Sequence, residues 1–337
     1  METRRKLKRC TRCVLPETFP GISFDAEGVC NYCRRYRGDA HLEKQKARLR
    51  RKFDEILTQV RGQGEYDCLM SWSGGKDSTY TMAVLKEQFG LRVLAFTFDN
   101  GFVSPRAFEN MRNVTEHLGV DHIIIKPRFD LLRRIFIGSA QQRDLYTPKA
   151  LERASNVCTS CMGLAKGIAL RLALERDIPL IAYGWSPGQA PITSAIFRGN
   201  PQMMRAMLQA TLEPLRSLAG EAIAPYFPSE AQLSAASRWP YNVSPLAFLD
   251  FDEEAEVEHI RKLGWQRPDD TDPNSTNCLL NAFAIQSHIE QMGFHPYALE
   301  LANLVRQGYL DREEAIARLE QPPNPEVLAA VQAKLSG

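Results

Sequence analysis

A short segment with two glycines, a lysine and an aspartate carries the side chains that phosphate chemistry needs. It covers residues 73–79, reads SGGKDST, and lies between a mostly apolar run and a run with helical periodicity. Two glycines let the backbone approach an anion closely, while the first N–H groups of a helix and the Lys76 ammonium supply positive potential. Asp77 can cap the helix or hold Mg²⁺. The residues expected to contact the phosphates of a bound nucleotide are Ser73, Gly74, Gly75, Lys76, Asp77 and Ser78.

The spacing of this loop excludes the Walker A pattern. Lys76 is followed by Asp77 rather than Ser or Thr, and no glycine stands five residues before Gly75. The segment instead resembles the SGGxDS signature of the PP-loop ATP pyrophosphatases, which hold the pyrophosphate of ATP and leave its α-phosphate open to attack. The resemblance implies an enzyme that uses ATP and Mg²⁺ to adenylate an oxygen atom and releases pyrophosphate, with Lys76 and Asp77 as catalytic residues.

The first four cysteines have the spacing of a structural zinc site. Two CxxC pairs are separated by sixteen residues, and prolines and glycines supply turns between them. Four thiolates complete a tetrahedron and leave no open position, so the metal would be structural. A rubredoxin-like iron or a redox pair are the alternatives. The expected ligands are Cys10, Cys13, Cys30 and Cys33.

Three further cysteines could hold a different metal group. Cys158 and Cys161 open a segment with helical periodicity, and Cys278 lies far downstream. Three thiols can bind three irons of a [4Fe–4S] cluster and leave the fourth iron open for sulfide, which would make these residues catalytic. Alternatively, Cys278 is a small buried apolar residue and the pair caps a helix or forms a redox pair. Cys68, within an apolar run, is expected to be plain core.

Two resemblances bear on the chemistry. The run 158–167 resembles the cysteine pair and following basic helix of the iron–sulfur tRNA 2-thiolation enzymes, which are PP-loop proteins. The segment 10–33 resembles the opening of the PP-loop N-acetyl sugar amidotransferases, which take ammonia from a glutaminase partner. Together the two resemblances cover about the first 190 residues. They imply either sulfur or ammonia as the group that displaces AMP from the adenylated substrate.

The spare cysteines favour sulfur, because ammonia chemistry gives no reason for them. The expected function is therefore adenylation of a carbonyl or amide oxygen and its replacement by sulfur delivered through the cluster. The alternatives are an ammonia-dependent amidotransferase and a metal-bearing nucleic-acid-binding or redox-sensing protein without turnover. The substrate would be a small molecule or tRNA, and the expected partners are a sulfur donor or a glutaminase and a second copy of the chain in a homodimer.

One departure from the thiolation enzymes argues against tRNA as the substrate. In those enzymes a Gly-His-x2-Asp-Asp type of segment usually follows the fourth strand, whereas here Gly184 leads into WSPGQAP at 185–191. The acidic and histidine side chains are missing. This difference suggests a pocket rebuilt for another substrate.

Alternating strand and helix patterns predict the elements that position these residues. Strands are expected at 66–71, 91–98, 121–126 and 178–183, with helical patterns between them. This order predicts an α/β fold with a doubly wound parallel sheet that binds ligands at the carboxyl ends of its strands. Asp99 follows the second strand and Gly184 the fourth, so both are expected to contact the nucleotide. A long helix is expected over the nucleotide face at 192–218.

The chain divides into four expected regions. They are a zinc ribbon at 1–40, a linking helix at 41–62, a PP-loop domain at 63–220 and a mainly helical portion at 221–337 that supplies Cys278. No run of about 18 apolar residues and no signal-peptide stretch stand out, so the protein is expected to be cytoplasmic and away from membranes. The net charge is only +2. The basic residues Arg4, Arg5 and Lys6 could contact RNA or phosphate, or form a solvated flank.

Overall fold

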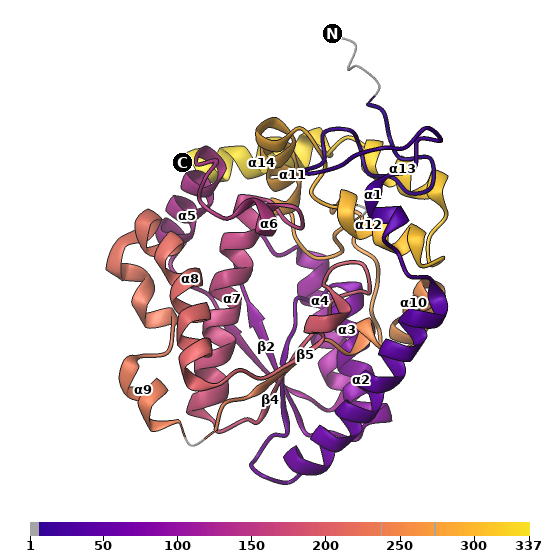
Figure 1. Ribbon diagram of the computed structural model, residues 1–337. Helices are drawn as coiled ribbons and strands as arrows, with labels where there is room; N and C mark the ends of the chain where they lie inside the picture. The colour runs from indigo at the N-terminus through magenta and orange to yellow at the C-terminus, as the bar shows by residue number, and fades with distance from the viewer. Residues whose placement is uncertain (1–6, 237, 273) are drawn as a thin grey trace.

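A six-stranded sheet forms the centre of the molecule (Figure 1). The computed structural model describes residues 7–236, 238–272 and 274–337, so Arg4, Arg5 and Lys6 lie outside the described residues. The strand order is β3-β2-β1-β4-β6-β5, and all neighbouring pairs are parallel except β5 with β6. The strands are β1 (Cys68–Ser71), β2 (Val93–Phe98), β3 (Asp121–Ile125), β4 (Leu180–Tyr183), β5 (Ile196–Phe197) and β6 (Tyr241–Val243).

The sequence predicts β1 to β4 and misses the last two strands. β5 has two residues and β6 three, which is too short for hydrophobic periodicity to detect. β6 lies in the region expected to be mainly helical, yet it pairs with β4 and extends the sheet. The helix expected over 192–218 is also wrong at its start, because α8 (Pro201–Ala219) begins only after the Asn200 side chain caps it.

Helices cover both faces of the sheet, as a doubly wound fold requires. On one face, Leu69, Phe96 and Ile181 pack against α5 (Phe129–Gln141), α7 (Asn156–Glu175) and α8. On the other face, Met70 and Ala95 pack with four further helices. These are α2 (Asp39–Val60), α3 (Lys76–Ala83), α4 (Pro105–Leu118) and α10 (Glu253–Lys262). Alternate side chains of each strand thus serve two cores. Because α8 packs on α5 and α7, it lies on the sheet face opposite α3.

One described helix, α7, has the length and apolar composition of a membrane span. This differs from the expectation that no segment of the chain does. More than half of the apolar window is buried inside the protein, and α7 packs against β1, β2 and β4. Core helices of globular proteins pass the same compositional test. The apolar residues of α7 are therefore explained by its position over the sheet.

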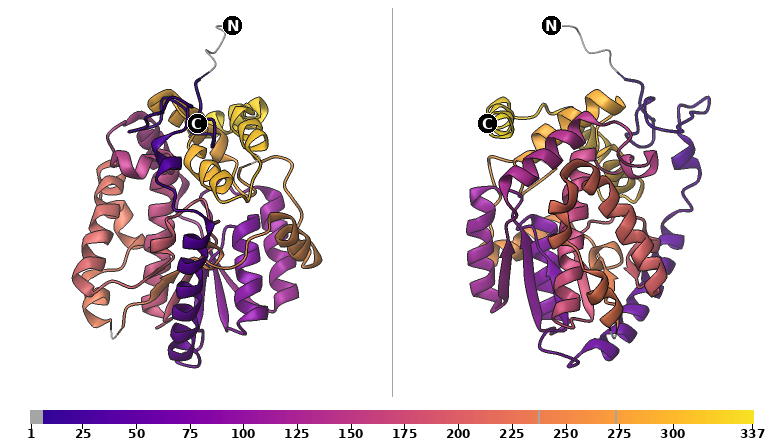
Figure 2. Two further views of the ribbon diagram at one scale, coloured as in Figure 1. Left: turned by 45° about the vertical axis from the view of Figure 1, so that its right-hand side comes forward. Right: turned by 90° about the vertical axis from the view of Figure 1, so that its left-hand side faces the viewer.

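The N-terminal and C-terminal segments of the described chain lie at the same end of the molecule (Figure 2). The N-terminal cysteines pack with apolar residues of the C-terminal helices α12 (Ala298–Arg306) and α13 (Arg312–Glu320) in a third core. The helices α11 (Leu280–Met292) and α14 (Pro325–Ser336) pack against each other nearby. The short helices are α1 (Asn31–Arg34), α6 (Pro148–Leu151) and α9 (Glu230–Ala235), and a π-helical segment, Val84–Gln88, continues α3.

Candidate functional site

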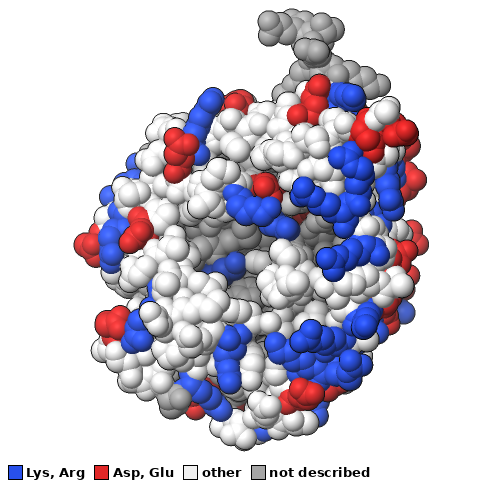
Figure 3. Space-filling view, in the orientation of Figure 1, with Lys and Arg blue, Asp and Glu red and all other residues white. Residues whose placement is uncertain are grey.

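A cavity of about 550 Å³ lies at the carboxyl ends of the central strands. Its walls include residues of the phosphate loop, of the start of α7, of the segment after β4, of α12 and of the segment 274–278. Figure 3 shows that the molecule is hollowed near the centre of one face, with Lys and Arg side chains inside the hollow and around it. A cavity of this size is typical of small-molecule and cofactor sites. The expected residues that line it are Ser73, Gly75, Lys76, Asp77, Ser78, Gly184, Cys158, Cys161 and Cys278.

The phosphate loop has the backbone that the sequence predicts. Gly74 has φ of +76°, and a Cβ at this position would lie 2.7 Å from Met111 Cε and 3.1 Å from the Ala107 carbonyl oxygen. Gly75 precedes α3 and provides no side-chain cap. The hydroxyls of Ser73 and Ser78 lie 3.0 Å apart and close the turn. The start of α3 therefore lies at the cavity with its positive end toward it.

A distant polar segment covers this loop, and the sequence analysis did not assign it a role. The Lys76 backbone N–H donates to Thr276 Oγ1 at 2.8 Å, so a hydroxyl satisfies one of the N–H groups at the start of α3. Ser104 N–H donates to the carbonyl oxygen of Asn277 at 2.9 Å. The polar run NSTN before Cys278 is the only sequence signal for this contact. Cys278 follows two residues after Thr276 and lines the same cavity as the phosphate loop.

Two carboxylates hold the Lys76 ammonium. Its Nζ lies 2.7 Å from Asp77 Oδ1 and 3.5 Å from Glu253 Oε1 at the start of α10. Burial opposes the charge of Lys76, but these two carboxylates outweigh burial and raise its pKa. Both oxygens of the neighbouring Glu256 are buried without a hydrogen-bond partner, and burial together with Asp77 raises its pKa to about 8. Carboxylate oxygens are ligands that Mg²⁺ prefers, so this region suits a divalent cation beside bound phosphates.

Gly184 and Asp99 stabilise the backbone that follows β4 and β2. A Cβ on Gly184 would lie 2.2 Å from Ser78 Cα, so only glycine allows the end of β4 to approach the start of α3. The Asp99 carboxylate accepts from Gly101 N–H at 2.8 Å and lies 3.2 Å from Lys126 Nζ. Asp99 is absent from the cavity wall, whereas its neighbour Asn100 lines it. The turn after β2 thus reaches the cavity wall through Asn100, and contact of Asp99 with a nucleotide stays a prediction.

Asn100 joins two of the three central cysteines. Its Nδ2 lies 3.5 Å from Cys161 Sγ and 3.4 Å from Cys278 Sγ. Cys278 is held there because it forms an isolated antiparallel bridge with Val103. Cys158 lies in the first turn of α7, where its N–H donates to the Ser155 hydroxyl at 3.0 Å. All three side chains are partly buried and face one cavity, although Cys278 lies more than a hundred residues after the other two.

Burial keeps these three thiols protonated in the absence of a metal. Desolvation raises the pKa of Cys158 to about 11 and also raises the pKa values of Cys161 and Cys278. A thiol becomes a thiolate when a soft metal ion binds it. Three thiols on one cavity wall, without a fourth cysteine, cannot complete a closed four-cysteine zinc site.

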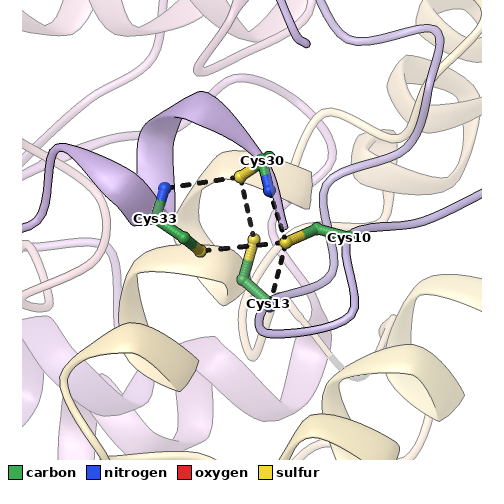
Figure 4. A group of neighbouring side chains, drawn as sticks. All are labelled: Cys10, Cys13, Cys30 and Cys33. Atoms are coloured by element: carbon green, nitrogen blue, oxygen red, sulfur yellow. Dashed lines mark hydrogen bonds between the residues drawn. The ribbon is translucent and has the colours of Figure 1, made fainter. Parts of the chain in front are cut away.

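The N-terminal cysteines form a separate and closed site (Figure 4). All four are buried, and their sulfurs lie within 4.8 Å of one another. The distance from Cys10 Sγ to Cys33 Sγ is 3.9 Å, and that from Cys13 Sγ to Cys30 Sγ is 3.8 Å. A tetrahedral zinc ion with Zn–S bonds of about 2.3 Å places its sulfurs about 3.8 Å apart. The observed spacing therefore fits one tetrahedral ion.

Backbone and guanidinium donors surround these four sulfurs. Cys10 Sγ accepts from Cys30 N–H at 3.2 Å, and Arg306 Nη1 lies 3.3 Å from Cys13 Sγ. Such donors stabilise thiolates around a metal and fix their orientation. Arg306 ends α12, and the same helix faces the cavity with Glu300. The closed cysteine site thus supports one wall of the cavity without being part of it.

Other cavity residues have no motif that could have revealed them. Glu300 on α12 lies 3.2 Å from the Ser186 hydroxyl, and burial raises its pKa to about 8. The Tyr297 hydroxyl donates to Asn281 Oδ1 at 3.1 Å. Lys166 on α7 faces the same cavity, where the surrounding protein lowers its pKa to about 8 by desolvation. These residues supply acid, base and charged groups to the cavity that the phosphate loop and the cysteines also line.

Comparison with known proteins gives remote similarities. No protein-family model matches the chain. An uncharacterized protein of Methanocaldococcus jannaschii is 26% identical over 320 residues, which cover 94% of this chain and 95% of that protein.

Two solved structures are similar at low levels. A U34-tRNA thiolase, NcsA from Methanococcus maripaludis with its [4Fe-4S] cluster, has a TM-score of 0.35 and 14% identity over 94% of this chain and 90% of its own. An NMN synthetase from Francisella tularensis has a TM-score of 0.36 and 13% identity over 87% of this chain and 95% of its own. Because the sequence identities and TM-scores are this low, the function has to be argued from the chemistry of the site.

Proposed function

We propose that this protein is a PP-loop enzyme that uses ATP to adenylate a carbonyl or amide oxygen and then replaces that oxygen with sulfur. The observation that carries the proposal is the segment 276–278. Its Thr276 hydroxyl contacts the first residue of α3, and Cys278 two residues later lies beside Asn100 and Cys161. One short segment thus connects a phosphate-binding loop to three cysteines in a shared cavity.

The first step uses the start of α3. ATP would place its β- and γ-phosphates against residues 73–78. The Lys76 ammonium would then leave its ion pairs with Asp77 and Glu253 and bind phosphate oxygens instead. The freed carboxylate of Asp77 would hold Mg²⁺. The substrate oxygen attacks the α-phosphorus, the bond from that phosphorus to the bridging oxygen breaks, and pyrophosphate leaves. Lys76 stabilises the charge on the departing group, and a bound Mg²⁺ would add positive charge there.

The second step replaces the activated oxygen. A sulfur nucleophile attacks the activated carbon, and AMP departs with the original substrate oxygen. Cys158, Cys161 and Cys278 would hold a [4Fe–4S] cluster, whose open iron can bind sulfide when the cluster is present. Asn100 would orient two of these cysteines, since its amide lies within 3.5 Å of both sulfurs.

One feature of the cavity favours ammonia as the alternative nucleophile. Glu300 lies on the cavity wall with a pKa raised to about 8, so its carboxylate, once ionised at mildly alkaline pH, could accept a proton from ammonium. The product would then be an amidine or amide rather than a thio compound. A glutaminase partner would supply the ammonia, whereas the sulfur reaction would need a sulfur donor.

Product analysis tests the proposed function. Protein purified without oxygen is incubated with ATP and Mg²⁺ together with either a small-molecule extract or total tRNA. We expect AMP and pyrophosphate to form, and we expect the Lys76→Ala variant to form neither. The matched control is Lys86→Ala, because the half-buried Lys86 donates to the Gly119 carbonyl oxygen and does not line the cavity. Formation of ADP and phosphate by the wild-type protein would contradict the proposal.

A further inference from the structure

Lys166 is a cavity lysine without a carboxylate partner. Among the residues that the structure describes, no Asp or Glu oxygen lies within 4 Å of its Nζ. Lys76 and Arg318, which line the same cavity, are each paired with Glu253. A cation that faces a ligand cavity without a counter-charge favours binding of an anion there.

The partners of Lys166 are aromatic rings. Its Nζ lies 4.3 Å from the centroid of the Trp185 ring and 5.9 Å from that of Tyr183. Both rings line the cavity, and their centroids are 5.8 Å apart. Arg153 adds a second cation to this wall, where it donates to the Gln189 carbonyl oxygen at 2.9 Å. An ammonium group beside two flat rings is suited to a ligand that joins an anionic group to a ring.

This wall adjoins both reactive parts of the proposed site. Trp185 directly follows Gly184, whose backbone contacts Ser78 of the phosphate loop. Lys166 is five residues after Cys161 on α7, which corresponds to about 7.5 Å along the helix axis. A molecule held by Lys166 and Trp185 would therefore lie within reach of both the phosphate loop and the cysteines.

We propose that Lys166 and Trp185 form the binding subsite of the molecule that is adenylated, and that this molecule carries a phosphate or carboxylate group next to a ring. The inference rests on the proposed function, since it assigns the second substrate to the same cavity. The phosphates of ATP would bind at residues 73–78, so Lys166 is available to bind another anion.

Binding of small probes to the full-length protein tests the subsite without any turnover. The probes are phenyl phosphate and benzoate, each of which joins an anion to a ring, and neutral benzyl alcohol. Their affinities are measured by titration calorimetry in the presence of a non-hydrolysable ATP analogue. We expect at least one anionic probe to bind more than tenfold more tightly than benzyl alcohol, and the preferred probe distinguishes phosphate from carboxylate.

Two substitutions define the role of each residue. Lys166→Met keeps the apolar stem and removes the charge, and it should weaken the preferred anionic probe at least tenfold while ATP-analogue affinity changes less than twofold. Trp185→Leu should weaken the same probe through loss of the ring. The matched control is Lys262→Met, since Lys262 is 70% exposed on α10 and should leave both affinities unchanged.

Three results would overturn the inference. One is equal affinity for benzyl alcohol and the anions, which would show that charge is not used. Another is failure of both anions to bind the wild-type protein. The third is a parallel loss of ATP-analogue affinity in Lys166→Met, which would place Lys166 in the nucleotide site. Because all three are binding results, they are distinct from a failure of AMP formation, which would instead count against the proposed function.

Discussion

Gly184 is the position where a single methyl group should disable the phosphate loop. A Cβ at this position would lie 2.2 Å from Ser78 Cα and 2.5 Å from Ser78 N, and both atoms belong to the backbone. Ordinary van der Waals contact begins at 3.4 Å. To move the new Cβ from 2.2 to 3.4 Å from Ser78 Cα, β4 and α3 would have to separate by about 1.2 Å. Overpacking of this kind costs about 1–3 kcal/mol of stability, and misplacement by about 1 Å can lower a reaction rate about 100-fold.

Gly184→Ala should therefore fold yet form AMP from ATP about 100-fold more slowly than the wild-type protein. The assay follows labelled AMP under the conditions described above, with thermal unfolding as the measure of stability. Gly64→Ala is the matched control, because a Cβ there would have its nearest contact at 3.7 Å. Wild-type AMP formation by Gly184→Ala would refute the close approach of β4 and α3 as a requirement of the site.

Three further predictions concern the metal site, the phosphate loop and Glu300. Cys30→Ser should lose zinc and loosen the N-terminal region, as measured by metal analysis and hydrogen exchange, and full zinc retention would contradict the closed site. Asp77→Ala should reduce AMP formation at least 100-fold with little change in melting temperature, and a small effect would remove Asp77 from catalysis. Glu300 stays protonated to about pH 8 in the folded chain but ionises near its usual pKa of 4.5 when unfolded, so its contribution to stability falls as pH rises between these values. Glu300→Gln should flatten that fall in melting temperature while Glu326→Gln leaves it unchanged, and an unaltered pH profile in Glu300→Gln would contradict the raised pKa.

Local patterns predict the central strands and the phosphate loop because these features depend on residues close together in sequence. β1 to β4 are apolar runs followed by turn or helix signals. The glycines of the phosphate loop are there because a side chain would clash with neighbouring atoms. β5 and β6 are too short to show a period, and they exist because β4 offers them a partner edge. Tertiary pairing rather than local propensity decides such strands.

In the site, too, local patterns predict some residues, whereas others depend on long-range contacts. CxxC spacing predicts the four N-terminal ligands, but no pattern shows that Arg306 donates to their sulfurs from the far end of the chain. The three other cysteines were grouped by ligand chemistry, as the thiols left after the zinc site, and no local pattern shows the long-range bridge from Val103 that brings Cys278 to the cavity. Glu300 and Lys166 become notable only through burial and missing partners, which are properties of the folded molecule. Asp99 was expected at the nucleotide because it follows β2, yet its carboxylate turns to Gly101 and Lys126.

The most direct test of the proposed chemistry is the iron content of protein purified without oxygen. Iron, acid-labile sulfide and zinc are measured on the wild-type protein, on Cys278→Ala and on Cys68→Ala, whose cysteine is fully buried in β1 outside the cavity. We predict about four irons and four sulfides per chain in the wild-type protein and in Cys68→Ala. Cys278→Ala should lose most of the iron while zinc content and ATP affinity stay unchanged. Wild-type protein that holds zinc but no iron, or Cys278→Ala with full iron content, would contradict the assignment of these three cysteines to a cluster.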